Sequence, residues 1–243
     1  NLDRKYIQTC WLSPKGNLKA LLEIHCFEKK LLLIVLEGNL KEFKDFLEDM
    51  IFPADQVSLS NNFFIIRIQE IRHNKSWRMF EPRILFEKDP KNYCEENKIE
   101  LIEQSKLEQW KIKQAIPRFN YEIDDNNNPL ELGLYDLVDF DKGCYLGQEA
   151  MARLNKISLL KQEIRLWSAS ITNKYFDLKD KKIYLDEDKL KIVGYITNAN
   201  LLKADQLIGL CLIKKNFLKE IKPFFNKDLG NLKIEKSVGS VFI

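Results

Sequence analysis

The sequence predicts an α+β protein whose last third is rich in strands. Before about residue 155, runs with strand character alternate with amphipathic helical patterns, which is typical of helices packed on one face of a sheet. From Lys156 onward, short apolar runs separated by turn residues recur at the spacing of a small barrel or sandwich. The change near Asn155 is a shift of composition and not a flexible linker, so we expect two regions, residues 1–155 and 156–243.

The first region begins with a predicted antiparallel sheet. Tyr6–Leu12 reads as a strand that ends in a Ser-Pro-Lys-Gly turn, and Leu18–Phe27 and Leu31–Glu37 read as a hairpin. Asn39 is a good N-cap for a following helix, and Pro53 ends that helix. Its apolar stripe is more typical of a core face than of a ligand groove, and it consists of Leu40, Phe43, Phe46, Leu47, Met50 and Ile51.

Further strands and one long helix complete the first region. Strand character returns at Val57–Leu59, Phe63–Ile68 and Arg83–Glu87. Tyr93–Ile116 is a charged stretch with apolar residues at helical spacings, so it predicts one long helix with a solvated face. Asp124–Pro129 is a polar loop. In the second region, strands are predicted at Gln162–Ala169, Lys182–Leu185, Leu190–Asn198, Leu207–Lys214 and Ser237–Phe242.

Composition excludes several classes of function. The chain has 243 residues with 45% hydrophobic and 31% charged residues, which is ordinary for a globular protein. The formal net charge of +3 is too small to indicate direct nucleic-acid binding. No apolar run approaches the ~20 residues that span a bilayer, so we expect no membrane partner. The chain starts at Asn1, in what reads as the middle of a domain, so we expect that its natural N-terminal part is missing.

The cysteines and histidines indicate a reducing compartment and no stable metal. The five cysteines are widely spaced without a Cys-x-x-Cys pair, so we expect no disulfide framework and a location in the cytoplasm or a reducing organelle interior. No cysteine cluster would hold an iron–sulfur cluster. His25 and His73 are isolated, so neither predicts a zinc site, and we expect both at the surface or at a strand edge. The cysteines are Cys10, Cys26, Cys94, Cys144 and Cys211.

The stretch from residue 139 to 149 carries most of the chemistry of the chain. Gly143 and Gly147 allow a tight turn or a close backbone approach. Helical spacing begins at about Leu146, which would place Cys144 just before the first turn of a helix. The helix dipole and the charge of Lys142 would both favour a thiolate there.

Two other considerations weigh on this thiol. Asp139 and Asp141 would oppose a thiolate if they point toward Cys144. The alternative interpretation is that Cys144 is a small buried hydrophobe, as most lone cysteines are. The surrounding glycines, cation and carboxamide favour a functional role.

The same residues resemble a known family. Lys142–Glu149 reads Lys-Gly-Cys-Tyr-x-Gly-Gln-Glu, which resembles the signature of YgfZ-type proteins, relatives of the T-protein (aminomethyltransferase) of the glycine cleavage system. The likeness continues into Ala152–Arg153 and includes the approach at Asn128–Leu134. It extends more loosely over Trp11–Lys214. It implies a T-protein-like folate-binding region at 1–155, with mixed or antiparallel sheets and helices, and a C-terminal β-barrel at 156–243.

The resemblance also implies a function and a set of residues. YgfZ-type proteins are linked to assembly or repair of iron–sulfur enzymes, with an indirect effect on tRNA modification, and they need the motif cysteine. The expected cofactor is tetrahydrofolate or a one-carbon derivative, and the expected partners are iron–sulfur client or assembly proteins. Cys144 takes the catalytic role. The motif shell is Lys142, Gly143, Tyr145, Gly147, Gln148, Glu149 and Arg153, and the cofactor-binding candidates are Glu131, Tyr145, Gln148 and Glu149.

Two departures from the family weaken the carry-over of folate binding, and a third weakens the carry-over from the Ser-Pro-Lys-Gly turn. Lys113 stands where T-protein relatives have an acidic residue that helps to hold the pterin, and a lysine cannot accept hydrogen bonds from pterin N–H groups. Ala115 replaces a glycine, and Asn17 replaces an arginine. Glu108 or Glu122 would be the substitutes for the missing carboxylate.

Three interpretations therefore remain. The first is an accessory factor with folate in a central cavity and Cys144 acting on a client or near the pterin. The second is a folate-dependent aminomethyltransferase with an acidic residue as general acid and base. Lys-Gly-Cys-Tyr stands where T-proteins have an acidic residue and Phe-Ile-Gly, which favours the first. The third is a scaffold that has lost its ligand, as Lys113 and Ala115 would allow.

Overall fold

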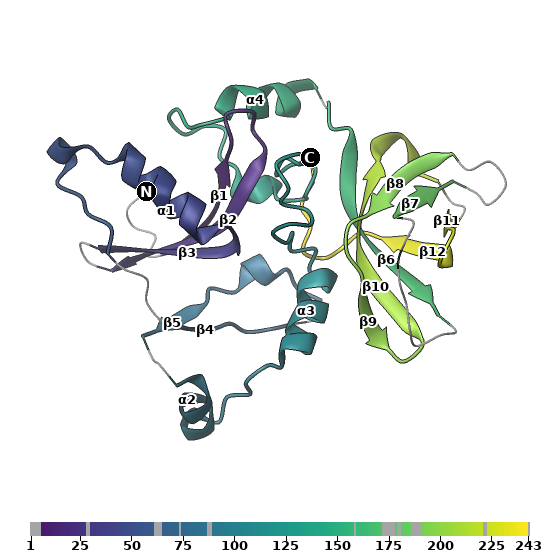
Figure 1. The fold of residues 1–243 in the computed structure, drawn as a ribbon, viewed down its shortest axis with the longest axis horizontal. Helices are drawn as coiled ribbons and strands as arrows, with labels where there is room; N and C mark the ends of the chain where they lie inside the picture. The colour runs from purple at the N-terminus through teal and green to yellow at the C-terminus, as the bar shows by residue number, and fades with distance from the viewer. Residues whose placement is uncertain are drawn as a thin grey trace.

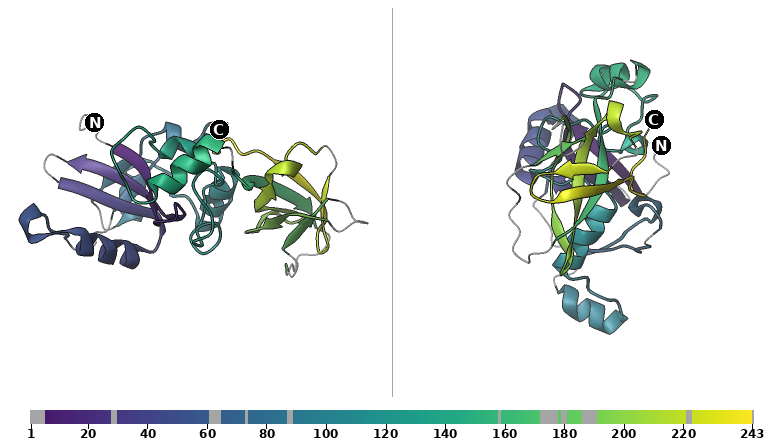
Figure 2. Two further views of the ribbon diagram at one scale, coloured as in Figure 1. Left: turned by 90° about the horizontal axis from the view of Figure 1, so that it is seen from above. Right: turned by 90° about the vertical axis from the view of Figure 1, so that its right-hand side faces the viewer.

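A computed structural model describes residues 6–27, 30–60, 65–72, 74–86, 89–157, 159–171, 178, 181–185, 191–220 and 223–242. It has an N-terminal sheet at one end and a barrel at the other, with a helix and a long loop region between them (Figure 1). Figure 2 shows that the molecule is elongated along this axis. The described helices and strands confirm an α+β fold.

The N-terminal sheet contains the predicted strands. Strands β1 (Tyr6–Leu12), β2 (Leu18–Phe27) and β3 (Lys30–Gly38) pair antiparallel as β1-β2-β3. The helix α1 (Leu40–Met50) follows, and the side chain of Asn39 accepts a hydrogen bond from the Glu42 amide at 3.2 Å, as its N-cap role predicts. These four predictions are confirmed.

His25 does not lie where the sequence predicts. It is buried on β2, 5% exposed, with its ring 4.9 Å from that of Tyr6. Its Nε2 is 3.7 Å from the fully buried Glu23, whose carboxylate also pairs with Arg67 at 2.6 Å. Because several donors converge on Glu23, this cluster is a structural anchor between β2 and β4. His73 lies outside the described residues.

The middle of the chain differs from prediction in two places. Strands β4 (Ile66–Ile68) and β5 (Arg83–Leu85) form a two-stranded ladder, but Val57–Leu59 forms no strand. The first part of the strand predicted at Phe63–Ile68, and the end of the one at Arg83–Glu87, lie outside the described residues. Short 3-10 turns occur at η1 (Pro53–Asp55), η2 (Trp77–Met79), η3 (Tyr135–Leu137) and η4 (Lys215–Phe217).

The long helix predicted at Tyr93–Ile116 is wrong, because the chain forms two helices there. Helix α2 spans Pro90–Asn97 and helix α3 spans Gln104–Lys113. Asp89 caps α2 by accepting hydrogen bonds from the amides of Lys91 and Asn92. Lys98 ends it in a left-handed conformation with φ 54°. A cap followed by proline at the first helical position marks the start of α2, and Lys98 marks its end.

The C-terminal region is a six-stranded antiparallel barrel with an extra strand. The order β6-β12-β11-β7-β8-β10 closes through a β10–β6 pair, and β9 extends from β10. The predicted Ser237–Phe242 strand is wrong, since this tail forms only an isolated bridge between Val241 and Leu134. The sequence also missed β9, β11 and β12. The strands are β6 (Gln162–Ser170), β7 (Lys182–Tyr184), β8 (Ile192–Ile196), β9 (Asn200–Lys203), β10 (Gln206–Lys214), β11 (Phe224–Asn226) and β12 (Gly230–Glu235).

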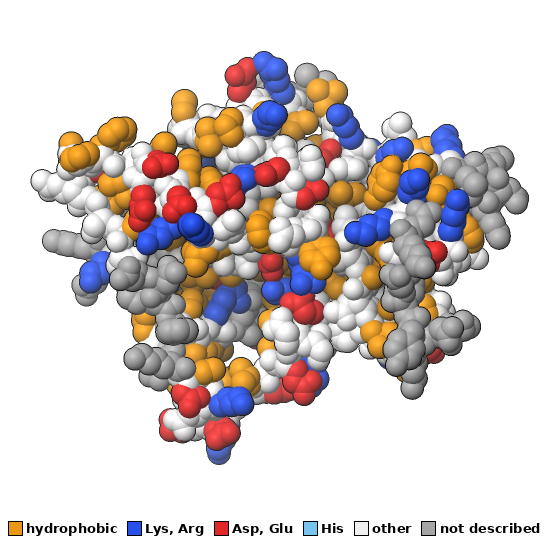
Figure 3. Space-filling view, viewed as in Figure 1, with side chains coloured by type: hydrophobic (Ala, Val, Ile, Leu, Met, Phe, Trp, Pro, Cys, Tyr) orange, Lys and Arg blue, Asp and Glu red, His pale blue; other side chains and the backbone are white. Residues whose placement is uncertain are grey.

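The barrel and the N-terminal region share a hydrophobic core. Along β10, Leu210 and Leu212 pack with Ile112 of α3, whereas Cys211 and Ile213 face the barrel interior with Trp167. The period of two along a strand lets one strand serve both cores. Within the described residues, no helix is long and apolar enough to cross a membrane. On the face in Figure 3, basic and acidic side chains of the described residues alternate and do not form one basic band.

Candidate functional site

A cavity of about 830 Å³ lies beside the motif. Its walls come from Ile7–Thr9 of β1, the segment Tyr135–Lys142, and Asn155 of the helix α4 (Gln148–Ile157). Sites for small molecules in proteins usually measure about 300–1,000 Å³, so this cavity is large enough for a cofactor. No sequence pattern indicates that β1 contributes to it.

The cavity wall combines aromatic rings with carboxylates. The ring centroids of Tyr135 and Phe140 are 5.7 Å apart. Asp136, Asp139 and Asp141 line the same cavity together with a single lysine, Lys142. Carboxylates accept hydrogen bonds from N–H groups, and flat rings stack on aromatic side chains. The lining therefore suits a planar, nitrogen-rich molecule.

Arg78 fixes one wall of the cavity from behind. Its side chain is 5% exposed, and its Nε lies 2.8 Å from Oδ2 of Asp136. Its Nη2 donates a hydrogen bond of 2.5 Å to the carbonyl of Gly239 in the C-terminal tail. Burial lowers the pKa of Arg78, and Asp136 opposes this shift. The position of Asp136 thus depends on the tail that follows the barrel.

Cys10 is a further thiol in this neighbourhood. It follows Thr9 on β1, and the charges of Arg78, Asp136 and Lys142 all act on it. Burial raises its pKa to about 12. The thiol is therefore neutral at physiological pH and a poor nucleophile. Strand spacing alone gave no reason to single it out.

The motif loop places Cys144 in solvent. The predicted helix is present as α4, which begins at Gln148, slightly later than the expected start near Leu146, and Cys144 is exposed in the loop that precedes it. A Cβ added to Gly143 would meet nothing within 4 Å, and its backbone is outside the left-handed region. The predicted steric need for glycine at this position is therefore wrong. Cys144 is not among the cavity-lining residues.

Gly147 has the steric role that the sequence predicts. Its φ is +82°, a conformation that side chains disfavour. An added Cβ would lie 2.6 Å from the carbonyl oxygen of Ser13, so the start of α4 packs directly on the β1–β2 turn. Met151, one turn later, is fully buried in the shared core. The glycine explains why the helix begins after it and not before.

Tyr145 is the motif residue that turns inward. Its hydroxyl is buried and has no hydrogen-bond partner among the described residues, and its ring packs against the shared core. Burial raises its pKa, and the charge of Asp139 adds to the shift. The ammonium group of Lys142 lies 4.8 Å from the ring centroid, a cation–π contact. The side chain of Lys142 is therefore oriented toward the ring of Tyr145.

The other predicted residues lie at three different places. Gln148 donates a long hydrogen bond of 3.4 Å to the carbonyl of Lys142 and so stays with the motif loop. Glu149 and Arg153 form an ion pair of 2.5 Å, and both side chains are more than two-thirds exposed. Glu131 lies in the segment that leads to the motif, but it is buried and accepts a hydrogen bond from the Lys161 amide at the approach to β6. Burial raises its pKa.

None of the expected carboxylate substitutes lines the cavity. Lys113 is exposed at the end of α3. Glu108 pairs with Arg118 at 2.9 Å, and Glu122 is fully buried against the barrel. Both carboxylates are therefore already engaged. Ala115 adopts φ +47°, so it keeps the left-handed backbone for which the glycine of relatives is suited.

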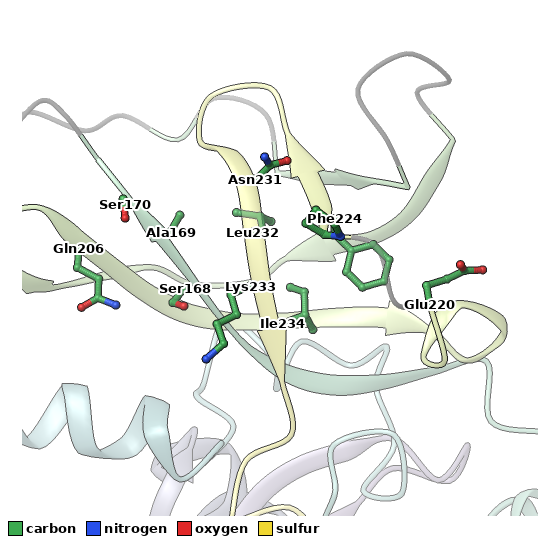
Figure 4. Close-up of a pocket in the computed structure, with 11 residues that line it drawn as sticks. Ser168, Ala169, Ser170, Gln206, Glu220, Phe224, Asn231, Leu232, Lys233 and Ile234 are labelled. Carbon is green, nitrogen blue, oxygen red and sulfur yellow. The ribbon is translucent and has the colours of Figure 1, made fainter.

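A second hollow lies on the barrel, away from the motif. It measures about 560 Å³ and is bordered by β6, β12 and the residues around Phe224 (Figure 4). Glu220 and Lys233 are the charged residues of its lining. We place the candidate site at the motif cavity, because that is where the charged and aromatic groups converge. Among the described residues, no group of three His, Cys, Asp or Glu is placed to hold a metal.

Comparison with solved structures bears on the fold. The structure of glycine cleavage system aminomethyltransferase T from Bartonella henselae superposes with a TM-score of 0.68 over 97% of this chain and 75% of that one. The fold is that of an aminomethyltransferase T. At 10% sequence identity, the likeness concerns fold alone.

Sequence comparison gives a shorter match. A chloroplast protein of Arabidopsis thaliana, named as a putative transferase, is 39% identical over 57 residues, or 24% of this chain. The match spans 13% of that relative's length. No protein-family model matches the chain.

Proposed function

We propose that this aminomethyltransferase-like chain is a tetrahydrofolate-binding accessory factor of the YgfZ type. It acts in the assembly or repair of iron–sulfur enzymes and affects tRNA modification through them. The observation that carries the proposal is the arrangement of the motif loop: Asp139–Lys142 line a cofactor-sized cavity, whereas Cys144 stands outside that cavity in solvent. Binding and thiol chemistry would thus occupy two sides of one loop.

The residues of the cavity fit a folate. A pterin offers a planar ring and N–H donors, which suit the rings of Tyr135 and Phe140 and the carboxylate of Asp139. The glutamate tail of a folate is anionic, which suits the ammonium group of Lys142. Asp139 is held in place because it accepts hydrogen bonds from the amides of Asp141 and Lys142. A bound folate would supply a carrier for one-carbon units.

The exposed thiol suits a macromolecular client. Gly143 leaves open space beside Cys144, so the surface of another protein can approach the sulfur closely. Tyr145, the residue after Cys144, packs against the core and so holds the loop on the protein. The reaction that Cys144 performs is left open by this proposal, whereas its position outside the cavity favours a client over the pterin.

The alternative proposal is a folate-dependent aminomethyltransferase. The fold and the carboxylates of the cavity favour it, since such a reaction needs a general acid and base. However, Asp136 is paired with Arg78, which makes this carboxylate less suited to act as a general acid and base. A scaffold without ligand is the third proposal, and Lys113 and Ala115 remain its support.

A cellular experiment tests the accessory role. Cys144→Ala should lower the activity of iron–sulfur enzymes in cells that depend on this protein, at unchanged protein level. Cys26→Ala, which removes a thiol from the N-terminal sheet, should leave those activities normal. Normal iron–sulfur enzyme activity in the Cys144→Ala cells would argue against the proposal. Transfer of an aminomethyl group to tetrahydrofolate by the purified protein would favour the alternative.

A further inference from the structure

A buried carboxylate lies between the N-terminal region and the barrel. Glu122 belongs to the loop after α3 and is fully buried. Its Oε1 is in close contact with the hydroxyl of Thr197 and accepts a hydrogen bond of 2.7 Å from the amide group of Asn198, both in the β8–β9 connection. Its Oε2 accepts a hydrogen bond of 3.0 Å from the Arg118 amide. One side chain therefore fastens two regions together.

The hydrogen-bond geometry accommodates a proton on Glu122. The Thr197 hydroxyl lies in hydrogen-bond range of Glu122 Oε1 and also 2.9 Å from the carbonyl of Leu210. A hydroxyl has one proton and donates to one acceptor at a time. If Glu122 is a carboxylic acid, it donates to Thr197, and Thr197 donates to Leu210. Asn198 cannot supply the proton by flipping, because its Oδ1 accepts from the Leu210 amide.

Burial without an ion pair also favours the neutral form of Glu122. Among the described residues no cation forms an ion pair with it, because the Arg118 guanidinium pairs with Glu108 at 2.9 Å. Cys211 of β10 lies close enough that the charge of Glu122 raises its pKa, and Arg165 of β6 opposes that shift. Burial raises the pKa of Glu122 to about 7, against the hydrogen bond from Thr197 and the charge of Arg118.

We propose that Glu122 is a proton-dependent latch, which as a neutral acid fastens the barrel to the N-terminal region and on ionisation loosens this joint. The effect would reach the cavity, because the tail that follows the barrel returns to the N-terminal region. The Ser237 hydroxyl in this tail donates to the carbonyl of Lys113 at 2.6 Å, and the Gly239 carbonyl holds Arg78, the partner of Asp136.

The direction of the pH effect follows from the raised pKa. Stability from the neutral acid is fully present below the ordinary value of 4.5 and is lost as the pH rises through about 7. From a pH well below 4.5 to a pH well above 7, the rise of the Glu122 pKa from 4.5 to about 7 corresponds to roughly a 300-fold change in the opening equilibrium constant of the joint. Between pH 6 and pH 8 the opening constant should rise about tenfold.

Amide hydrogen exchange at pH 6 and pH 8, corrected for intrinsic rates, tests the latch. The Arg118 amide reports the joint, and the Ile196 amide, which donates to the Lys181 carbonyl at 2.7 Å, reports the barrel alone. In the wild type, the opening constant measured at the Arg118 amide should rise about tenfold from pH 6 to pH 8, while that of the Ile196 amide stays constant. Glu122→Gln should abolish the pH dependence, whatever its overall stability. The exposed Glu100→Gln should behave as the wild type.

Two results would overturn the latch. One is the same opening constant for the wild-type Arg118 amide at both pH values, and the other is an unchanged pH dependence in Glu122→Gln. Carbon-13 NMR titration of the wild-type carboxyl groups decides the matter if the variant does not fold. A Glu122 carboxyl that titrates near pH 7 supports the latch, and one that titrates near its ordinary value refutes it.

Discussion

The motif loop and the barrel joint, where Glu122 bonds to Thr197 and Asn198, differ in the burial and hydrogen bonding of their residues. In the joint, Glu122 and Asn198 are almost completely buried, and several hydrogen bonds hold them. In the motif loop, Cys144 and Gly143 are exposed, and Gly143 has open space where a side chain would be. The joint therefore serves stability. No neighbour in the described structure requires glycine at position 143, which agrees with our proposal that this loop has a functional role.

Thiol labelling gives the largest expected difference between exposed and buried sites. An alkylating probe at neutral pH should modify Cys144 at least about a thousandfold faster than Cys211, because Cys211 is fully buried and reacts only after opening of the barrel. Mass spectrometry of digested protein measures both rates. Cys144→Ser should remove the fast phase alone. Similar alkylation rates at Cys144 and Cys211 would contradict the contrast between an exposed motif loop and a buried barrel interior.

Removing one acidic side chain from each region, Glu122 from the joint and Glu149 from the motif helix, should change the free energy of unfolding by different amounts. Glu122→Ala should lower the free energy of unfolding by about 3 kcal/mol at pH 6, because Asn198 and the Arg118 amide lose their acceptor in a buried site. Glu149→Ala should change it by less than about 0.5 kcal/mol, since its ion pair is exposed. Urea unfolding measures both. Equal losses would contradict the assignment of Glu122 to stability.

The two motif glycines should differ in how much their replacement by alanine lowers the free energy of unfolding. Gly147→Ala should cost about 2 kcal/mol, because φ is +82° and the new Cβ would collide with the Ser13 carbonyl. Gly143→Ala should stay within about 0.5 kcal/mol of the wild type. Thermal unfolding of the pair is sufficient. A costly Gly143→Ala would show that the loop is more constrained than its open surroundings indicate.

Local periodicity predicted the elements that depend on local chemistry. The strands β1 and β2 and the Asn39-capped α1 follow from alternation, helical spacing and capping. The strand β11 has three residues, too few for a periodic signal. The break between α2 and α3 depends on a left-handed Lys98, a residue type that rarely indicates such a turn.

The candidate site was predictable only in part. The motif marked the loop around Cys144, and glycine chemistry identified Gly147. The cavity was not predictable, because Thr9 and Tyr135 are distant in sequence and meet only through the tertiary fold. Glu122 was noticed as a candidate pterin ligand, but only the structure shows that Thr197 and Asn198 occupy its carboxylate.

Calorimetric titration with tetrahydrofolate tests the central claim, that ligand binding and the Cys144 thiol lie on separate sides of the motif loop. We predict saturable binding to the wild type and equal affinity in Cys144→Ala, because Cys144 does not line the cavity. Thr9→Phe, which fills the cavity from β1, should weaken binding at least about tenfold, or ~1.4 kcal/mol. Absence of binding to the wild type, or undiminished binding to a folded Thr9→Phe variant, would contradict the account.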